Sequence, residues 1–180
     1  RDDSHLANQA GTRGFVVGRV NGFTEALYDW LPDPKDQRPF TRLRMWGAAN
    51  QYINGTFAVR AVRDIPELTI SLSRLEGPGQ SVLEPGAIDV RVVLVRDRRN
   101  TLFRPSRVQM LTPEILLRDD RTRLPPRGRQ GGFGGGRCVT RVPAHQSRQF
   151  WLTVRVPDGS PPGEYRGEVV FGGRVESRLP

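Results

Sequence analysis

The sequence predicts an all-β protein, an antiparallel immunoglobulin-like β-sandwich with long loops. Strand-like runs recur about every ten residues, with turn-forming residues between them. No helical pattern exceeds two turns and no internal repeat is present. A chain of 180 residues with 15 prolines and 20 glycines suits one domain of many short elements that buries a substantial core.

Each predicted strand alternates apolar and polar side chains, so that its apolar set lines one face of a sheet. The alternation is clearest between residues 68 and 73, where Leu68, Ile70 and Leu72 alternate with Thr and Ser residues. In order along the chain, the strand-like runs cover residues 13–23, 40–46, 56–62, 68–77, 87–97, 148–157 and 163–173. We expect these faces to meet between two sheets, where each buried side chain contributes about 1.5–3 kcal/mol.

The core-facing residues of the other runs follow from the same alternation. They are Leu43 and Met45; Phe57, Val59 and Ala61; Ile88, Val90, Val92 and Leu94; and Phe150, Leu152, Val154 and Val156. Between residues 108 and 124, Pro113 argues against a continuous helix, because it has no amide hydrogen and its ring clashes with the preceding turn. Residues 31–39 hold three prolines and residues 127–137 are rich in glycine, so we expect both to be loops.

We expect two parts in the chain. Residues 1–39 form an N-terminal extension with an edge strand and a proline-rich loop, and residues 40–180 form the sandwich. The sequence starts at Arg1 without a methionine and stops shortly after a strand-like run, so we expect a piece of a longer protein. No apolar run approaches the length of a membrane span.

The stretch from Pro157 to Tyr165 is dense in turn formers and is interpreted as structural. Pro157 ends its strand because proline donates no hydrogen bond to the ladder. Pro162 fixes its φ angle and Gly163 accepts a positive one, which favours a tight turn between two core strands. Tyr165 is expected to bury its ring under the turn and to bond to nearby backbone through its hydroxyl, as in the tyrosine corner of Greek-key sandwiches.

Four segments of the sequence resemble segments of a known domain, and they occur in the same order as in that domain. They lie at residues 47–77, 87–95 and 110–120 and in the stretch W-L-T-V-R-V-P-D-G-S-P-P-G-E-Y-R-G-E-V. Together they are similar to the N-terminal β-sandwich domain that precedes the (β/α)8 catalytic barrel in bacterial glycoside hydrolases of the β-N-acetylgalactosaminidase type and their uncharacterised relatives. Three residues depart from the family's phrases, with Gln51 in place of Glu, and Arg74 and Glu114 each in place of Asp.

The resemblance implies a non-catalytic accessory domain that packs on the catalytic barrel of the same polypeptide and shapes one edge of its carbohydrate cleft, with a polysaccharide as a further expected partner. It also implies an extracytoplasmic bacterial enzyme, secreted or periplasmic, whose catalytic acids belong to the barrel. Two alternatives stay open. One is a stand-alone immunoglobulin-like module for carbohydrate binding or adhesion, and the other is a basic RNA-associated domain that uses residues 127–137.

The net charge of +9 invites a nucleic-acid interpretation. Lys35 is nevertheless the sole lysine among 28 basic residues, and the arginines are scattered along the chain, which is more typical of a GC-rich genome than of a phosphate-binding track. We therefore expect no nucleic-acid partner. Cys138 is the single cysteine, which excludes a disulfide framework and a cysteine-based metal site, and we expect it to be half-buried in a strand.

No pattern of catalytic residues stands out. The acidic pairs sit in polar, loop-like surroundings where carboxylates are solvated or paired, and they are Asp2 with Asp3, Asp33 with Asp36, and Asp119 with Asp120. The sequence contains no nucleophile elbow and no His or Cys spacing for a metal. We expect this chain to carry no catalytic residue, metal ion or cofactor.

Four aromatic residues are candidates for stacking against a sugar ring: Trp30, Trp46, Tyr52 and Trp151. Trp30 lies in a loop-flanked stretch and is expected to be the most exposed. Burial is the expectation for Trp46 and Tyr52, whereas Trp151 lies opposite the core-facing set of its strand, where a barrel or another strand would cover it. The sequon that begins at Asn54 is interpreted as a turn.

Overall fold

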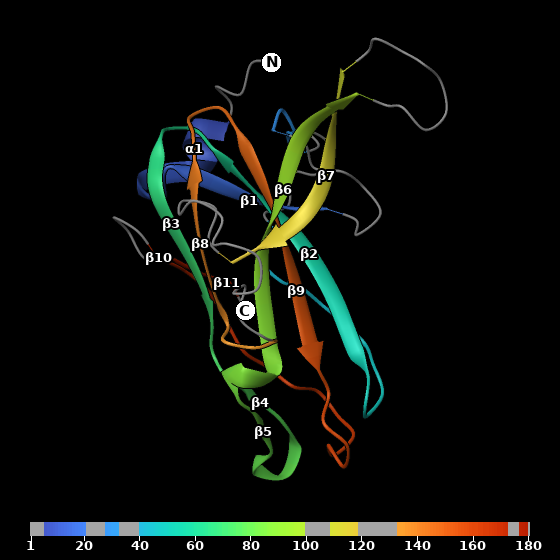
Figure 1. The fold of residues 1–180 in the computed structure, drawn as a ribbon. Coiled ribbons are helices and arrows are strands. Elements are labelled where there is room, and N and C mark those ends of the chain that lie inside the picture. Colours follow the sequence, from blue (N-terminus) through green and yellow to red (C-terminus); the bar gives the residue numbers. More distant parts are fainter. Residues whose placement is uncertain are drawn as a thin grey trace.

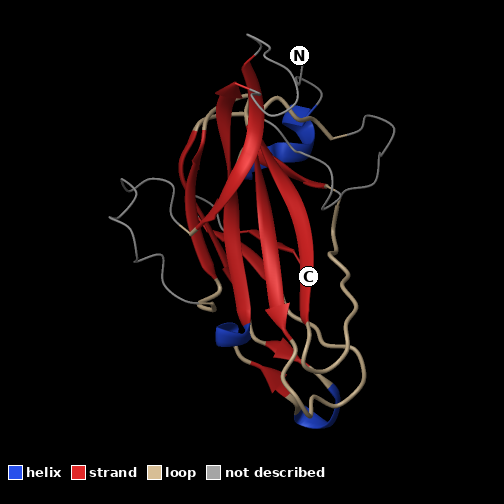
Figure 2. Cartoon of the chain, turned by 45° about the vertical axis from the view of Figure 1, so that its right-hand side comes forward, coloured by secondary structure: helices blue, strands red, loops and turns tan. Residues whose placement is uncertain are grey.

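The computed structural model consists of two antiparallel β-sheets packed face to face, which confirms the predicted all-β sandwich (Figure 1). Figure 2 shows the strands in two layers, with the helical turns confined to the ends. The structure describes residues 6–20, 28–32, 40–99, 109–118, 133–172 and 177–179.

The larger sheet has five strands in the order β1-β2-β9-β6-β7, and all neighbours in it are antiparallel. Its strands are β1 (Phe15–Arg19), β2 (Tyr52–Ala61), β6 (Ile88–Arg99), β7 (Gln109–Leu117) and β9 (Ser147–Arg155). β1 precedes residue 40 and yet pairs directly with β2. Strands far apart in the sequence are thus neighbours in space, as in other Greek-key sandwiches.

The smaller sheet has four strands in the order β11-β10-β3-β8. They are β3 (Ile65–Leu72), β8 (Arg137–Val142), β10 (Val169–Gly172) and β11 (Ser177–Leu179). A hairpin of β4 (Leu75–Glu76) and β5 (Val82–Leu83) extends from one end of the sandwich (Figure 1). The helical turns are α1 (Leu6–Ala10), η1 (Gly11–Arg13), η2 (Pro78–Gln80) and η3 (Pro85–Ala87).

The core lies between the sheets and is centred on three phenylalanines. Phe57 of β2 stacks on Phe150 of β9 with ring centroids 5.4 Å apart, and it meets Phe171 of β10 edge-on at 5.8 Å. All three rings are buried. The alternation predicted for these strands is confirmed, since the buried core residues include Phe57, Val59, Ala61, Leu68, Ile70, Val90, Val92, Phe150 and Leu152.

Pro113 lies in β7, so the prediction that this region forms no continuous helix is confirmed over residues 109–117. β7 is an edge strand, and its register with β6 shifts between Leu94 and Val95, where Val95 lies opposite Pro113. Sheet edges and ladder irregularities are the places where a sheet accepts a residue without an amide hydrogen.

Residues 40–46 are extended but form no strand, so the strand predicted there is wrong. β1 pairs with β2 only at residues 57–61, and the extended segment lies beside the preceding part of β2, with Leu43 and Met45 close to Gly55. Leu43 and Met45 do pack inward, as the alternation predicts. The alternation identifies buried side chains, whereas backbone pairing depends on a neighbouring strand that the local sequence does not specify.

The strand predicted over residues 163–173 is shorter than expected, because β10 begins at Val169. β9 and β10 belong to different sheets, so residues 156–168 cross from one sheet to the other, and a single tight turn does not join the two strands. This crossover packs on the β4–β5 hairpin, where Glu76 and Arg166 exchange two backbone hydrogen bonds of 2.8 Å.

Cys138 lies in β8 and is fully buried, not half-buried as expected. Its Sγ atom lies 3.7 Å from the carbonyl oxygen of Leu117, where the end of β7 meets β8. The neighbouring Val139 amide donates to the Arg118 carbonyl oxygen at 2.8 Å, so the two sheets are joined along this side. No helix in the described part of the chain is long and apolar enough to span a membrane.

Candidate functional site

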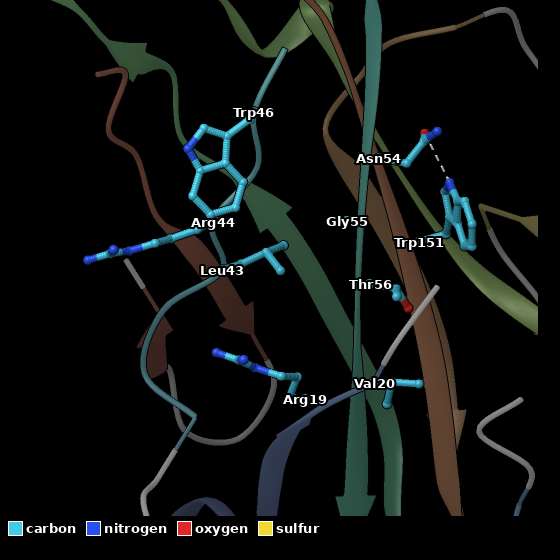
Figure 3. A pocket seen from close by; sticks show the side chains of 9 residues that line it. All are labelled: Arg19, Val20, Leu43, Arg44, Trp46, Asn54, Gly55, Thr56 and Trp151. Atoms are coloured by element: carbon cyan, nitrogen blue, oxygen red, sulfur yellow. Dashed lines mark hydrogen bonds between the residues drawn. The ribbon is translucent and has the colours of Figure 1, made fainter. Parts of the chain in front are cut away.

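An open groove lies beside β2, at the point where its pairing with β1 ends. Its volume is about 320 Å³. The residues that line it come from β1, β2, β9 and the extended segment before β2, and they are Arg19, Val20, Leu43, Arg44, Trp46, Asn54, Gly55, Thr56 and Trp151. Figure 3 shows Trp46 and Trp151 on opposite sides of β2. Two of the four candidates for sugar stacking therefore line the same groove.

Trp46 and Tyr52 are far more exposed than expected. Their exposed fractions are 80% and 56%, so the expected burial of both is wrong. Trp46 points outward because Leu43 and Met45 occupy the inward positions of the extended segment. Tyr52 is not among the groove residues, and it meets the ring of Phe133 edge-on, with 5.2 Å between the centroids.

Trp30 and Trp151 are both half-buried. Trp30 packs against Gly18, and its carbonyl oxygen accepts a hydrogen bond of 2.7 Å from the Ser147 hydroxyl. The expectation that Trp30 is the most exposed candidate is wrong, because these tertiary contacts hold it against the larger sheet. Trp151 lies on the face of β9 opposite the core and borders the groove.

The backbone that carries Trp46 packs against β2 on both sides of this residue. Gly55 has no side chain, and a Cβ atom there would lie 2.7 Å from Sδ of Met45, so the segment before Trp46 lies directly against β2. On the other side of Trp46, a Cβ atom on Gly47 would likewise collide with the Ile53 side chain, so this backbone also lies close to β2. The exposed indole is therefore carried by a backbone that packs closely against β2 on both sides.

Trp151 is oriented by its neighbours. Its indole Nε1 donates to Oδ1 of Asn54 at 3.2 Å, and the Thr153 hydroxyl donates to the same oxygen at 2.9 Å. Asn54 lies inside β2, so the interpretation of its sequon as a turn is wrong. Both bonds use the side-chain oxygen of this exposed residue, which leaves its NH2 group as a donor for a ligand.

The groove carries positive charge. Arg19 and Arg44 are both exposed, and no Asp or Glu is among the described residues that line it. Glu164 is close enough to feel the charge of Arg44, but it accepts a hydrogen bond of 2.8 Å from Arg166. That bond and the charge of Arg166, with smaller effects of Arg42 and Arg44, lower the pKa of Glu164. The described side chains that line the groove therefore include two cationic groups and no carboxylate.

Asp89 of β6 is a buried carboxylate on the same sheet. Arg91 donates to one of its oxygens at 2.6 Å and Arg118 donates to the other at 3.0 Å. Since both oxygens are bound by guanidinium groups, the arrangement is that of a structural ion pair between β6 and the end of β7.

The predicted turn residues lie at the other end of the sandwich, against the β4–β5 hairpin. The Tyr165 hydroxyl donates to the Pro161 carbonyl oxygen at 3.0 Å, and a hydrogen bond of 3.2 Å joins it to Ser81. The Tyr165 ring is half-buried and lies against Gly77. The other predicted turn residues belong to the same crossover and are Pro157, Pro162 and Gly163.

The acidic pairs considered as catalytic candidates all lie outside the described residues, as do Lys35 and residues 127–132. Across the ranges that the structure describes, no group of three or more His, Cys, Asp or Glu side chains lies close enough to hold a metal ion. The described residues that line the groove present two indole rings, an amide and two guanidinium groups.

Sequence reasoning missed Asn54, Arg19 and Arg44 as groove residues. Asn54 meets Trp151 because the β2–β9 register pairs Thr56 with Trp151, and a register cannot be derived from either strand alone. The available signal was the alternation in β2, which places Asn54 and Thr56 on the face opposite Phe57 and Val59.

A solved structure has a similar fold, that of a family 123 glycoside hydrolase from Clostridium perfringens whose analysis concerns glycolipid glycan hydrolysis. The match has a TM-score of 0.61 and 12% sequence identity, and it covers 92% of this chain. It covers only 26% of that enzyme's chain. No protein-family model and no curated protein matches the sequence. The chain therefore shares its fold with one part of a larger glycoside hydrolase.

Proposed function

We propose that this chain is a non-catalytic, N-terminal β-sandwich domain of a bacterial glycoside hydrolase, which packs on the catalytic barrel of the same polypeptide and shapes one edge of its carbohydrate cleft. The observation that carries the proposal is the structural likeness, which covers 92% of this chain but 26% of a family 123 enzyme. The four phrases of the sequence that resemble such a domain support it independently. In this arrangement, the reaction belongs to the larger remainder of the enzyme.

The gene provides the first test. We expect the reading frame to continue after Pro180 into a (β/α)8 barrel with a pair of acidic residues. Because the enzyme is expected to be extracytoplasmic, the frame should begin with a signal peptide upstream of Arg1. A frame that ends near Pro180, or that continues into an unrelated fold, contradicts the proposal.

Assays on the protein provide the second test. The isolated chain is expected to show no hydrolysis of an aryl N-acetyl-β-galactosaminide, and hydrolysis by it would contradict the non-catalytic role. Deleting this domain from the full-length protein is expected to lower the melting temperature of the barrel, because an interface with the sandwich is lost. An unchanged melting temperature would contradict the packing of the domain on the barrel.

A stand-alone carbohydrate-binding module is the second candidate function. It is favoured by one observation, the groove between Trp46 and Trp151, which is built entirely from this chain. Under this alternative the gene encodes no barrel, while the isolated chain still binds a saccharide. The presence or absence of a barrel sequence downstream of this chain therefore distinguishes the two candidate functions.

A further inference from the structure

We propose that the groove beside β2 is a site for an acidic saccharide, in which a sugar ring stacks on Trp46 and carboxylate or sulfate groups of the saccharide pair with Arg19 and with Arg44. The inference names the ligand class of the groove that favours the second candidate function, and it does not depend on whether the gene encodes a barrel. The presence or absence of a barrel in the gene bears only on the proposed function.

Trp46 supplies the stacking surface. Its side chain is 80% exposed, yet the residues on both sides of it pack closely against β2, Met45 against Gly55 and Gly47 against Ile53. An aromatic ring on a closely packed backbone loses little conformational entropy when a ligand binds. One apolar face of a pyranose ring can cover the indole while the sugar hydroxyls at its edge stay free for hydrogen bonds.

Hydrogen-bonding groups of β2 lie next to this surface. The Val156 amide donates to the Gln51 carbonyl oxygen at 2.8 Å, so the odd-numbered residues of β2 bond to β9. The backbone groups of Asn54 and Thr56 consequently turn to the opposite edge, and the β1 ladder ends at the residue next to Thr56. Together with the Asn54 NH2 group, they offer donors and acceptors that suit sugar hydroxyls.

The charge and size of the groove define the saccharide further. Figure 3 shows Arg19 near Val20 and Arg44 beside Trp46. Guanidinium groups bind carboxylate and sulfate oxygens through parallel, charge-assisted hydrogen bonds. A neutral sugar cannot form these bonds, so an acidic saccharide should bind more tightly. A volume of about 320 Å³ is at the lower end of the range for ligand sites, roughly 300–1,000 Å³, so a short segment fits.

A peptide that adds a strand to the edge of β2 is the rival occupant. It is disfavoured because Leu43 and Met45 already lie against Gly55, beside the backbone to which an added strand would bond.

The test is titration calorimetry of the whole 180-residue chain with cellohexaose, its sulfated derivative and hexagalacturonate. Sulfated cellohexaose presents sulfate groups to the groove, and hexagalacturonate presents carboxylate groups. We expect at least one acidic hexasaccharide to bind more tightly than cellohexaose, and its binding to weaken with added salt. Trp46→Ala should weaken that binding about tenfold or more, and Arg19→Ala about threefold or more.

Tyr52→Ala and Arg137→Ala are the matched controls, because they remove an exposed aromatic residue and an exposed arginine that do not line the groove. Both should keep binding within about twofold, and the melting temperature of Trp46→Ala should equal that of the parent. Failure of all three saccharides to bind would overturn the proposal. Equal losses in groove and control variants, or cellohexaose as the tightest ligand, would overturn it as well.

Discussion

Gly77 offers a sharp test of how the crossover is held on the β4–β5 hairpin. A Cβ atom at this position would contact the Tyr165 ring, 2.6 Å from its Cδ1 atom, and would lie 2.7 Å from the Ser81 hydroxyl. The ring has little room to move, because its hydroxyl is bonded to Pro161 and Ser81. The φ angle of Gly77 is −124°, which any residue adopts, so the cost of Gly77→Ala is steric.

Overpacking of this kind costs about 1–3 kcal/mol. In a chain of this size, that loss lowers the melting temperature by roughly 2–12 °C. The assay is equilibrium unfolding in urea followed by tryptophan fluorescence. Gly86→Ala is the control, because a Cβ atom there meets nothing within 4 Å. The control should change the free energy of unfolding by less than about 1 kcal/mol, and in the stabilising direction.

A double-mutant cycle then isolates the contact between the new methyl group and the ring. With Tyr165→Ala as the background the ring is absent and Ser81 can rotate away, so Gly77→Ala should cost less than about 0.5 kcal/mol. The same cost of Gly77→Ala with and without the ring would refute the steric reasoning.

Three further predictions concern the core, an ion pair and the response to pH. Phe57→Ala should lower the free energy of unfolding, measured in urea, by about 3–5 kcal/mol, because Phe57 is fully buried. Phe133→Ala is the control on the surface and should cost less than about 1 kcal/mol. Equal losses in the two variants would contradict the location of the core. Asp89→Ala should cost about 1.5–3 kcal/mol by removing the bonds to two guanidinium groups, and an unchanged urea midpoint would show that the pair is not structural. Arg166 lowers the pKa of Glu164, so the stabilisation from this pair is complete above the ordinary pKa of glutamate and is lost as the pH falls through the lowered pKa. In a carboxyl-carbon NMR titration, Arg166→Ala should therefore raise the pKa of Glu164, and no change would contradict the stated cause.

The faces of the main strands could be predicted because alternation is a local property. Leu68 and Ile70 are two residues apart and so share a face, whichever strand lies beside them. Pro113 likewise argued against a helix from its own chemistry, without reference to the rest of the chain. The number and spacing of such runs then sufficed for the all-β sandwich.

The groove could not be predicted, because exposure and proximity depend on distant segments. Trp30 is covered through contacts with Gly18 and Ser147, the latter 117 residues away in the chain, and nothing near Trp30 in the sequence specifies them. The turn formers after Pro157 signal a change of direction. Which sheet receives the next strand depends on pairing across the whole chain.

The thiol of Cys138 can be used to measure local opening of the sandwich. It is the sole thiol in the sequence and is 1% exposed, with its Sγ atom beside the Leu117 carbonyl oxygen, so a thiol reagent reaches it only after the side of the sandwich at β7 and β8 opens. When closing is fast, the labelling rate relative to that of a free thiol gives the equilibrium constant for opening. None of the substitutions considered alters Cys138, so one reagent can rank the variants in native buffer, far below the urea concentrations at which they melt.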